Sequence, residues 1–333
     1  MSYKTRKTYY KELEKIRKRP IITYVTSIRP GCQAQMSQDV LPIFINQIDK
    51  IKGENKDIDL LIISNGGDPI VSWRIISLLR EKFENISVLV PYTAYSAATL
   101  LALGADEIIM HSYGNLGPLD PQFVFPGPNN KMKSISYEEI KKYIEFVKEI
   151  GITDQELLQR SFEKLTDEIK PTSIGFAKRS SQLALTMSQK LLATHMKDEN
   201  KTKQISETLN SKFYHHGYPL YRKEAIEIGL PIANHNEIIE RLIWAIYEDF
   251  VEELDFNKVF KEDQAVVNKI QEVAKTKLFF PTSVNIKIKQ NCLESSSLNC
   301  YNNLVISAQC NTDGNKIENI NISSSLEDWV VEE

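Results

Sequence analysis

Three short apolar runs, separated by helical patterns, constrain the fold of this chain most strongly. The run IDLLIIS ends at NGGDP, ISVLVP follows about twenty residues later, and EIIM comes third. Buried parallel strands have this apolar character and are joined by crossover helices. IVSWRIISLLREKF and SAATLLALGA supply the helical patterns between them. The alternation predicts an α/β fold whose strand connections cross in the right-handed sense.

The remaining segments divide the chain into three predicted units. Residues 1–19 are charged, have helical spacing and stop at Pro20. Residues 20–254 hold the strand PIITYVTSI, the alternating core and, from about Ser136, a helical arm. Residues 255–333 are rich in Ser, Asn and β-branched residues, which predicts a small β appendage of short strands. No residue of that last unit indicates its role.

Composition excludes several classes of function. The 333 residues carry a net charge of −3, so there is no basic surface of the kind that nucleic-acid binding needs. The four cysteines have no CxxC or CxxH spacing, and we expect free thiols, no metal and a cytoplasmic protein. The chain has neither GxGxxG nor a P-loop, so no cofactor is expected.

The segment Val88–Ala105 is the one candidate for a membrane span. It has eighteen residues without formal charge, but Pro91 and Ser96 interrupt it and Asp106 follows at once. A span needs about 20 predominantly apolar residues. We therefore predict a buried strand followed by a core helix. The N-terminus lacks the apolar stretch of a secretory signal.

Two places in this core can carry chemistry. Consecutive glycines after a buried strand, in NGGDP, let the backbone approach a ligand closely and offer an N–H to an oxyanion. Ser96 falls at the turn between ISVLVP and SAATLLALGA. Its hydroxyl either caps the helix or acts as a nucleophile, and local residues alone leave both readings open.

Four pieces taken in order resemble the serine dehydrogenase proteinase family, relatives of signal peptide peptidase A with the Clp-protease and crotonase-type fold. They are LLIISNGGDP, VPYTAYSAATLLALGADEIIM, GNLGPLDPQ and YHHGYPLYRKEAIEIGL, within about Pro20 to Ala233. The resemblance implies a ββα spiral with a helical arm and a self-associating serine peptidase. It also implies Ser96 as nucleophile, with the backbone N–H groups of Gly67 and Ala97 as oxyanion donors. One departure is AYSAAT, where Ala97 and Ala98 stand where relatives often have glycine.

The resemblance indicates the general base through two positions in the chain. Clp-type peptidases place a His about two dozen residues after the nucleophile and an Asp before the EA helix. Here Asp120 falls at the first position and His215 and His216 at the second. A Ser–His–Asp site needs geometry and no fixed chain order, so we predict Ser96, His216 and Asp120, with His215 as an equal chemical candidate.

Three rival hypotheses remain open. A Ser–Lys dyad would use Lys131 or Lys133 as the base, which requires burial of the amine. A crotonase-like acyl-CoA enzyme would share the oxyanion loop but leave Ser96 unexplained. A non-catalytic scaffold is favoured only by the Ala97–Ala98 pair. The favoured reading is a serine endopeptidase acting on peptides or unfolded proteins as a homo-oligomer, with residues 255–333 available to recruit a protein partner.

Overall fold

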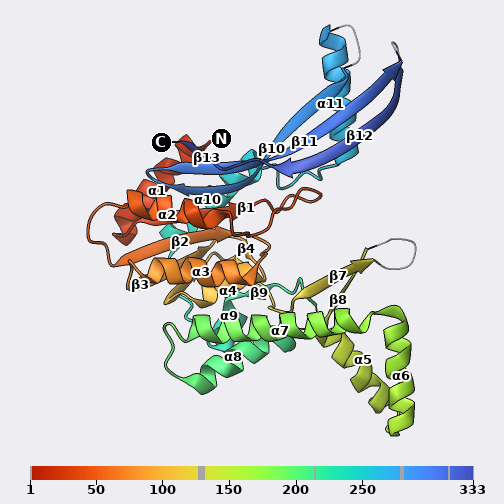
Figure 1. Cartoon of the computed structure of the whole chain (residues 1–333). Helices are drawn as coiled ribbons and strands as arrows, with labels where there is room; N and C mark the ends of the chain where they lie inside the picture. Colours follow the sequence, from red (N-terminus) through yellow and green to blue (C-terminus); the bar gives the residue numbers. More distant parts are fainter. Residues whose placement is uncertain (1, 127–131, 214, 278–280, 314–315, 333) are drawn as a thin grey trace.

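The computed structural model describes residues 2–126, 132–213, 215–277, 281–313 and 316–332, and its centre is one mixed sheet (Figure 1). The strands are β1 (Ile21–Thr26), β2 (Asp57–Ile63), β3 (Asn85–Val90), β5 (Glu107–Met110), β10 (Ser283–Ser295), β11 (Asn299–Asp313), β12 (Lys316–Leu326) and β13 (Val330–Glu332). Their order is β12-β11-β10-β1-β2-β3-β5, with β13 on β11. The pairs from β1 to β5 are parallel and those from β1 to β12 antiparallel.

Helices cover both faces of the sheet. On one face lie α2 (Val40–Lys50), α3 (Pro69–Arg80) and α4 (Ala97–Leu103), and on the other α1 (Tyr3–Arg17) and α10 (Glu237–Glu253). Side chains along a strand alternate between faces. Leu60 and Ile62 accordingly join the first core and Leu61 and Ile63 the second, as a strand buried on both sides requires.

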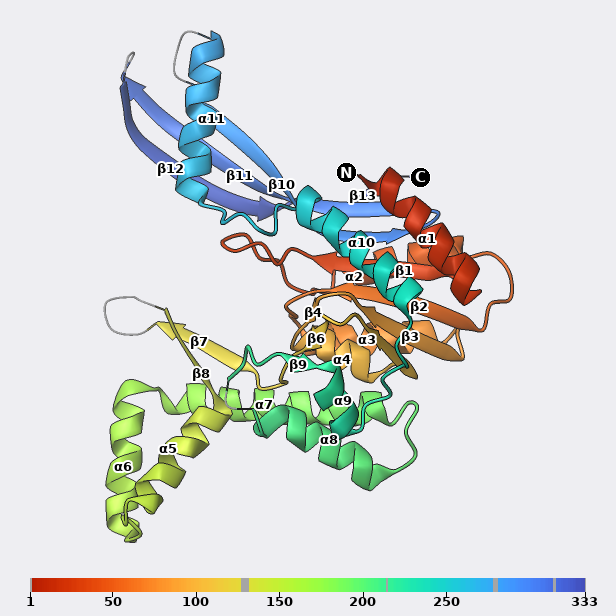
Figure 2. The same cartoon turned by 180° about the vertical axis from the view of Figure 1, so that it is seen from behind.

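A buried ion cluster ties the N-terminal helix to α10 and to β10 of the central sheet. The guanidinium of Arg6 is fully buried and pairs with Glu294, Asp249 and Glu253. The Arg6 Nε–Glu294 Oε2 distance is 2.9 Å. Buried charges persist where each has a partner of opposite sign. The cluster therefore holds α1 and α10 against β10, and Figure 2 shows the two termini on the same side of the molecule.

The C-terminal strands continue the central sheet, because β10 pairs with β1. They are longer than the short strands expected, and β10 alone spans 13 residues. A helix that the sequence reading did not foresee, α11 (Glu262–Lys277), packs on the outer part of these strands. The division at residues 19 and 254 into separate units stays a prediction.

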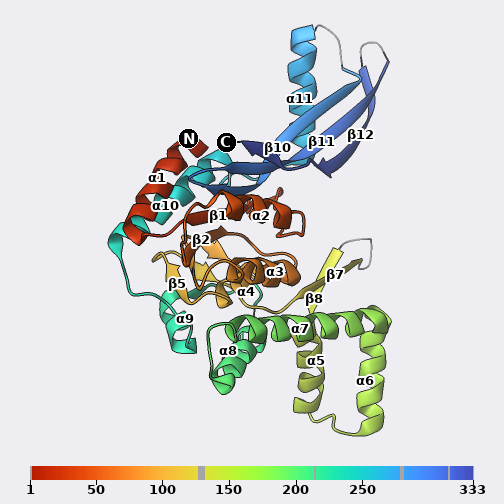
Figure 3. The same ribbon diagram turned by 60° about the vertical axis from the view of Figure 1, so that its left-hand side comes forward.

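The helical arm expected after Ser136 is present. It consists of α5 (Tyr137–Glu149), α6 (Gln155–Glu168), α7 (Pro171–Leu192) and α8 (Glu199–Ser211), and an unforeseen hairpin of β7 (Gln122–Pro126) and β8 (Met132–Ser136) precedes it. The outer ends of this arm and of the C-terminal strands project from opposite ends of the molecule toward the same side (Figures 1 and 3).

The apolar segment 88–105 forms a strand and a helix, as predicted. It contains the end of β3, the short β4 (Thr93–Ala94) and α4, whose side chains are all buried. β4 belongs to a three-stranded sheet with β6 (Asn115–Leu116) and β9 (Leu220–Tyr221), which α9 (Arg222–Ile228) follows. Among the described helices, none combines the length and apolarity needed to cross a membrane.

Candidate active site

Ser96 occupies a strained turn between β4 and α4. Its backbone has φ 51° and ψ −116°, a region that non-glycine residues rarely adopt. Such strain persists only where the surroundings enforce it, and it clusters at functional sites. The side chain makes no capping hydrogen bond to α4. The Ser96 side chain therefore does not cap α4, which was the structural role that the sequence left open for it.

The Gly66–Gly67 loop presses directly against this turn. Gly66 has φ +102°, and a Cβ there would lie 2.7 Å from the Tyr95 carbonyl oxygen and 2.8 Å from Ser96 Cβ. Gly67 has φ +152°, and its Cβ would lie 2.4 Å from backbone atoms of Met36. Both the backbone angles and the close approaches exclude a side chain. The pair of glycines is thus what allows the loop to reach the serine.

Hydrogen bonds leave two backbone donors beside Ser96 unused. The Gly66 N–H donates to Ser64 Oγ at 3.0 Å, and its carbonyl accepts from the Met36 N–H at 2.8 Å. Within the described chain, the N–H groups of Gly67 and Ala97 donate to no protein acceptor. Two such donors near a nucleophile are what an oxyanion hole requires.

His216 and Asp120 form a hydrogen-bonded pair across 96 residues of chain. The distance from His216 Nδ1 to Asp120 Oδ1 is 2.8 Å, and Gln122 Nε2 donates to the other carboxylate oxygen at 3.1 Å. The hydrogen bond to the Asp120 carboxylate raises the pKa of His216, in opposition to partial burial. With Nδ1 as the donor, the ring keeps Nε2 free to accept a proton.

One cleft joins these parts. Ser96, Gly67 and His216 all line a cavity of about 580 Å³, and Leu100, Leu119 and Ala184 add apolar surface. Asp120 lies behind His216 and faces a neighbouring cavity instead. The structure therefore brings together the predicted nucleophile, histidine and oxyanion loop, with the carboxylate in contact with the histidine.

The other candidate bases lie elsewhere. His215 is exposed, its Nδ1 accepts the Gly217 N–H at 3.0 Å, and it lines the neighbouring cavity. Lys133 lies on β8 with about half its side chain exposed, 3.8 Å from Glu168, and does not line the Ser96 cleft. Lys131 falls outside the described residues. The described chain also holds no cluster of three or more His, Cys, Asp or Glu suited to a metal ion.

Two positioning residues were missed by the sequence reading. Ser64 accepts the Gly66 N–H and contacts Thr26 Oγ1 at 2.7 Å, which anchors the loop to β1. Gln122 orients Asp120. Ser64 is the last residue of the apolar run before the glycines, so its position at the start of the loop could have been predicted from the sequence. The partner of Gln122 could not be read from the chain, because it depends on the path of the β7–β8 hairpin.

A strained serine that shares one cleft with a glycine loop and an aspartate-bonded histidine, on an α/β core of this topology, is typical of the Clp-type serine proteinases. Residues 44–255, more than half of the chain, match the sequence model of a family described as ClpP-like SDH-type serine proteinases. The chain belongs to that family, and the Clp-protease-type fold predicted from the sequence is confirmed.

The relatives carry little further information. Two uncharacterized proteins of Methanocaldococcus jannaschii are 32% identical over 183 residues and 28% identical over 199 residues. The two matches cover 54% and 60% of this chain. They cover 54% and 59% of the length of the relatives, so the chain spans little more than half of each. Two mutant structures of the 1510-N membrane-bound stomatin-specific protease, one with a substrate peptide, have TM-scores of 0.38 and 0.37 and identities of 15% and 16%. They cover 66% and 65% of this chain, and 83% and 77% of their own.

The close contact between Gly66 and Ser96 predicts that a methyl group added at position 66 lowers the reactivity of Ser96. In Gly66→Ala, the new Cβ would overlap the Ser96 turn, so the turn must move and the reactivity of Ser96 toward a fluorophosphonate should fall at least tenfold. Gly151→Ala is the matched control, because Gly151 also has a positive φ (+92°) but open space around its Cβ position. Equal labelling rates for the two variants would contradict the prediction.

Proposed function

We propose that this chain is a serine endopeptidase that hydrolyses peptides or unfolded proteins through an acyl-enzyme on Ser96. The observation that supports this most is the shared cleft, where Ser96, the Gly67 loop and the Asp120-bonded His216 converge. Membership of a serine proteinase family gives the same reaction class. A cytoplasmic location remains a prediction from the four cysteines, all of which are free and buried.

In this mechanism His216 Nε2 takes the proton of the Ser96 hydroxyl as the oxygen attacks the peptide carbonyl. The developing oxyanion accepts hydrogen bonds from the Gly67 and Ala97 N–H groups, which have no acceptor among the described residues to give up. His216 then protonates the leaving amine. Asp120 keeps the imidazole in the Nδ1–H tautomer and stabilises its charged form. A water molecule then attacks the acyl-enzyme ester, with His216 again taking and returning the proton, and Ser96 is released.

The rivals have weaker support. A Ser–Lys dyad that uses Lys133 would have to bring its amine from the exposed surface of β8 to Ser96. Lys131, the other lysine of that hypothesis, falls outside the described residues. A scaffold without activity would leave the backbone strain at Ser96 and the His216–Asp120 bond unexplained. A crotonase-like acyl-CoA enzyme would leave the same two features without a use.

Active-site labelling separates the triad from the dyad. A fluorophosphonate should label the wild-type protein on Ser96 and fail to label Ser96→Ala. His216→Ala should slow labelling by roughly three orders of magnitude or more, since loss of a triad member removes most of the catalysis. Lys133→Ala, which removes an exposed amine, should react at the wild-type rate.

Mass spectrometry of the labelled protein gives the site, and circular dichroism shows whether each variant folds. Labelling that survives Ser96→Ala would overturn the peptidase proposal. Labelling that is lost in Lys133→Ala but kept in His216→Ala would replace the triad by the dyad.

The pH dependence tests Asp120. A base must be neutral to accept a proton, so kcat/KM should rise with pH through the pKa of His216, which the Asp120 carboxylate holds above the ordinary value of about 6.5. Asp120→Asn removes that carboxylate, so the rise should move to lower pH and kcat should fall by roughly 10³–10⁴. Asp154→Asn, an N-cap on α6, is the control. A profile for Asp120→Asn that matches wild type would exclude this role.

We also propose that the chain self-associates through its helical arm. Large apolar side chains are exposed on α5, directly after it and on α6: Phe146, Ile150, Leu157 and Phe162. Contiguous exposed apolar surface marks interaction sites. Sedimentation should give a mass that is a multiple of 38.2 kDa, and Phe146→Asp with Ile150→Asp should shift it toward the monomer. A wild-type monomer at micromolar concentration would contradict this.

A further inference from the structure

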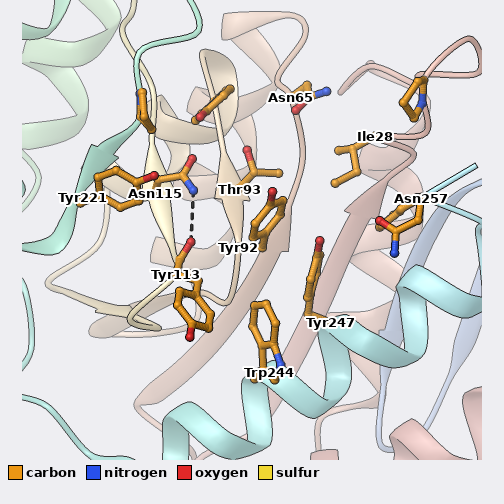
Figure 4. A pocket seen from close by; sticks show the side chains of 14 residues that line it. Ile28, Asn65, Tyr92, Thr93, Tyr113, Asn115, Tyr221, Trp244, Tyr247 and Asn257 are labelled. Carbon is orange, nitrogen blue, oxygen red and sulfur yellow. Dashed lines mark hydrogen bonds between the residues drawn. The ribbon is translucent and has the colours of Figure 1, made fainter. Parts of the chain in front are cut away.

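A second cavity lies beside the Ser96 turn, and the proposed mechanism does not use it (Figure 4). Its volume of about 540 Å³ is in the range of ligand sites. Asn65 lines both this cavity and the Ser96 cleft, and Tyr95, the residue before Ser96, also lines it. The two cavities therefore share one lining residue, and Tyr95 places the second cavity next to the Ser96 turn.

Aromatic side chains form the wall of this second cavity. Figure 4 shows Trp244 and Tyr247 rising from α10 beside Tyr92. The ring centroids of Trp244 and Tyr247 are 4.9 Å apart, and those of Tyr92 and Tyr247 are 4.7 Å apart and stacked. Tyr113, 5.4 Å from Trp244, is 62% exposed, and Tyr221 is 50% exposed. Exposed aromatic rings that line a concave surface indicate a binding site, because the folded chain leaves their apolar faces in contact with water.

The lining is uncharged. None of the fourteen described residues that form it is Asp, Glu, Lys, Arg or His. Burial raises the pKa values of the Tyr95 and Tyr247 hydroxyls, so these phenols remain neutral. A charged side chain entering here would lose hydration without gaining a counter-ion. One face of Trp244 is also covered by the ring of His111, stacked at 4.6 Å, which reduces the surface open to a cation.

The base of the cavity has unused hydrogen-bonding capacity. Thr93 and Asn115 are more than nine-tenths buried, and within the described chain Thr93 Oγ1 and Asn115 Oδ1 have no hydrogen-bond partner. The Asn115 amide is held in place by a 3.2 Å bond to the Tyr113 carbonyl. Buried polar atoms without partners are rare and costly. Both oxygens are shielded from solvent, so a ligand amide N–H would reach Thr93 Oγ1 only after that side chain rotates toward the cavity.

We propose that this cavity is a substrate subsite that takes a large uncharged side chain, aromatic or aliphatic, of an extended peptide whose scissile bond lies at Ser96. The proposal rests on the peptidase function above: because Asn65 lines both cavities, one extended peptide bound at Ser96 could place a side chain in the second cavity. The aromatic wall would bind the side chain, and the polar base would meet the backbone amide beside it.

Binding can be measured without cleavage in the full-length Ser96→Ala protein. Capped hexapeptides carry one Phe at each position in turn, and matched peptides carry Glu or Lys there instead. The fluorescence of Trp244 is the reporter, assigned by repeating the titration in Trp244→Phe. At one position, Phe should give a saturable change and a Kd at least tenfold below those of the Glu and Lys peptides.

Tyr113→Ala should weaken binding of the Phe peptide about three- to tenfold, since one aromatic contact is lost. Leu326→Ala, which removes an exposed apolar side chain outside both cavities, should leave it unchanged. In the protein with Ser96 intact, Tyr113→Ala should raise KM for that peptide without slowing fluorophosphonate labelling, because the small probe fills only the Ser96 cleft.

Each failure has a distinct signature. Equal affinity for the Phe, Glu and Lys peptides, tighter binding of the Lys peptide, or Phe binding untouched by Tyr113→Ala would overturn the subsite while leaving Ser96 labelling intact. Absence of labelling at Ser96 in the wild type would instead defeat the peptidase proposal itself.

Discussion

The contact on which the whole site depends is the approach of the Gly66–Gly67 backbone to the Ser96 turn, with no room for a Cβ between them. Both segments leave the central sheet at the carboxyl ends of neighbouring parallel strands. Backbone hydrogen bonds of 3.1 Å and 3.0 Å between Ser64 and the segment 93–95 hold them in register. The same register accompanies the strained backbone of Ser96, and in the part of the chain that the structure describes the adjacent N–H groups have no acceptor. Strain and free donors are thus two results of one packing arrangement.

The proposed proton acceptor reaches this place by a long path. Asp120 leaves the core before the helical arm, and His216 returns after it, so α5 to α8 lie between two residues whose side chains are 2.8 Å apart. The arm between them also exposes the apolar side chains through which we propose that copies of the chain associate.

Ser96 stands between two cavities of similar size and different chemistry. The cleft with His216 has the groups proposed for bond cleavage, and the aromatic cavity has those suited to recognition. Two rings of its wall, Trp244 and Tyr247, come from α10, which the buried Arg6 cluster ties to α1 and β10. The N-terminal helix and β10 thereby support the helix that carries part of this cavity.

The sequence by itself determined the α/β core, the Ser96 turn and the glycine loop, because these depend on local periodicity and on backbone angles open to few residue types. It also carried an unused signal for α11, in the helical spacing of Val266 and Ile270. The β7–β8 hairpin and the pairing of β10 with β1 had no such local mark. Only the tertiary structure put His216, rather than its neighbour His215, in the Ser96 cleft, since adjacent side chains in a turn point different ways. The path of the chain through the fold decides which residue lines the same cavity as Ser96, and no local sequence pattern encodes that path.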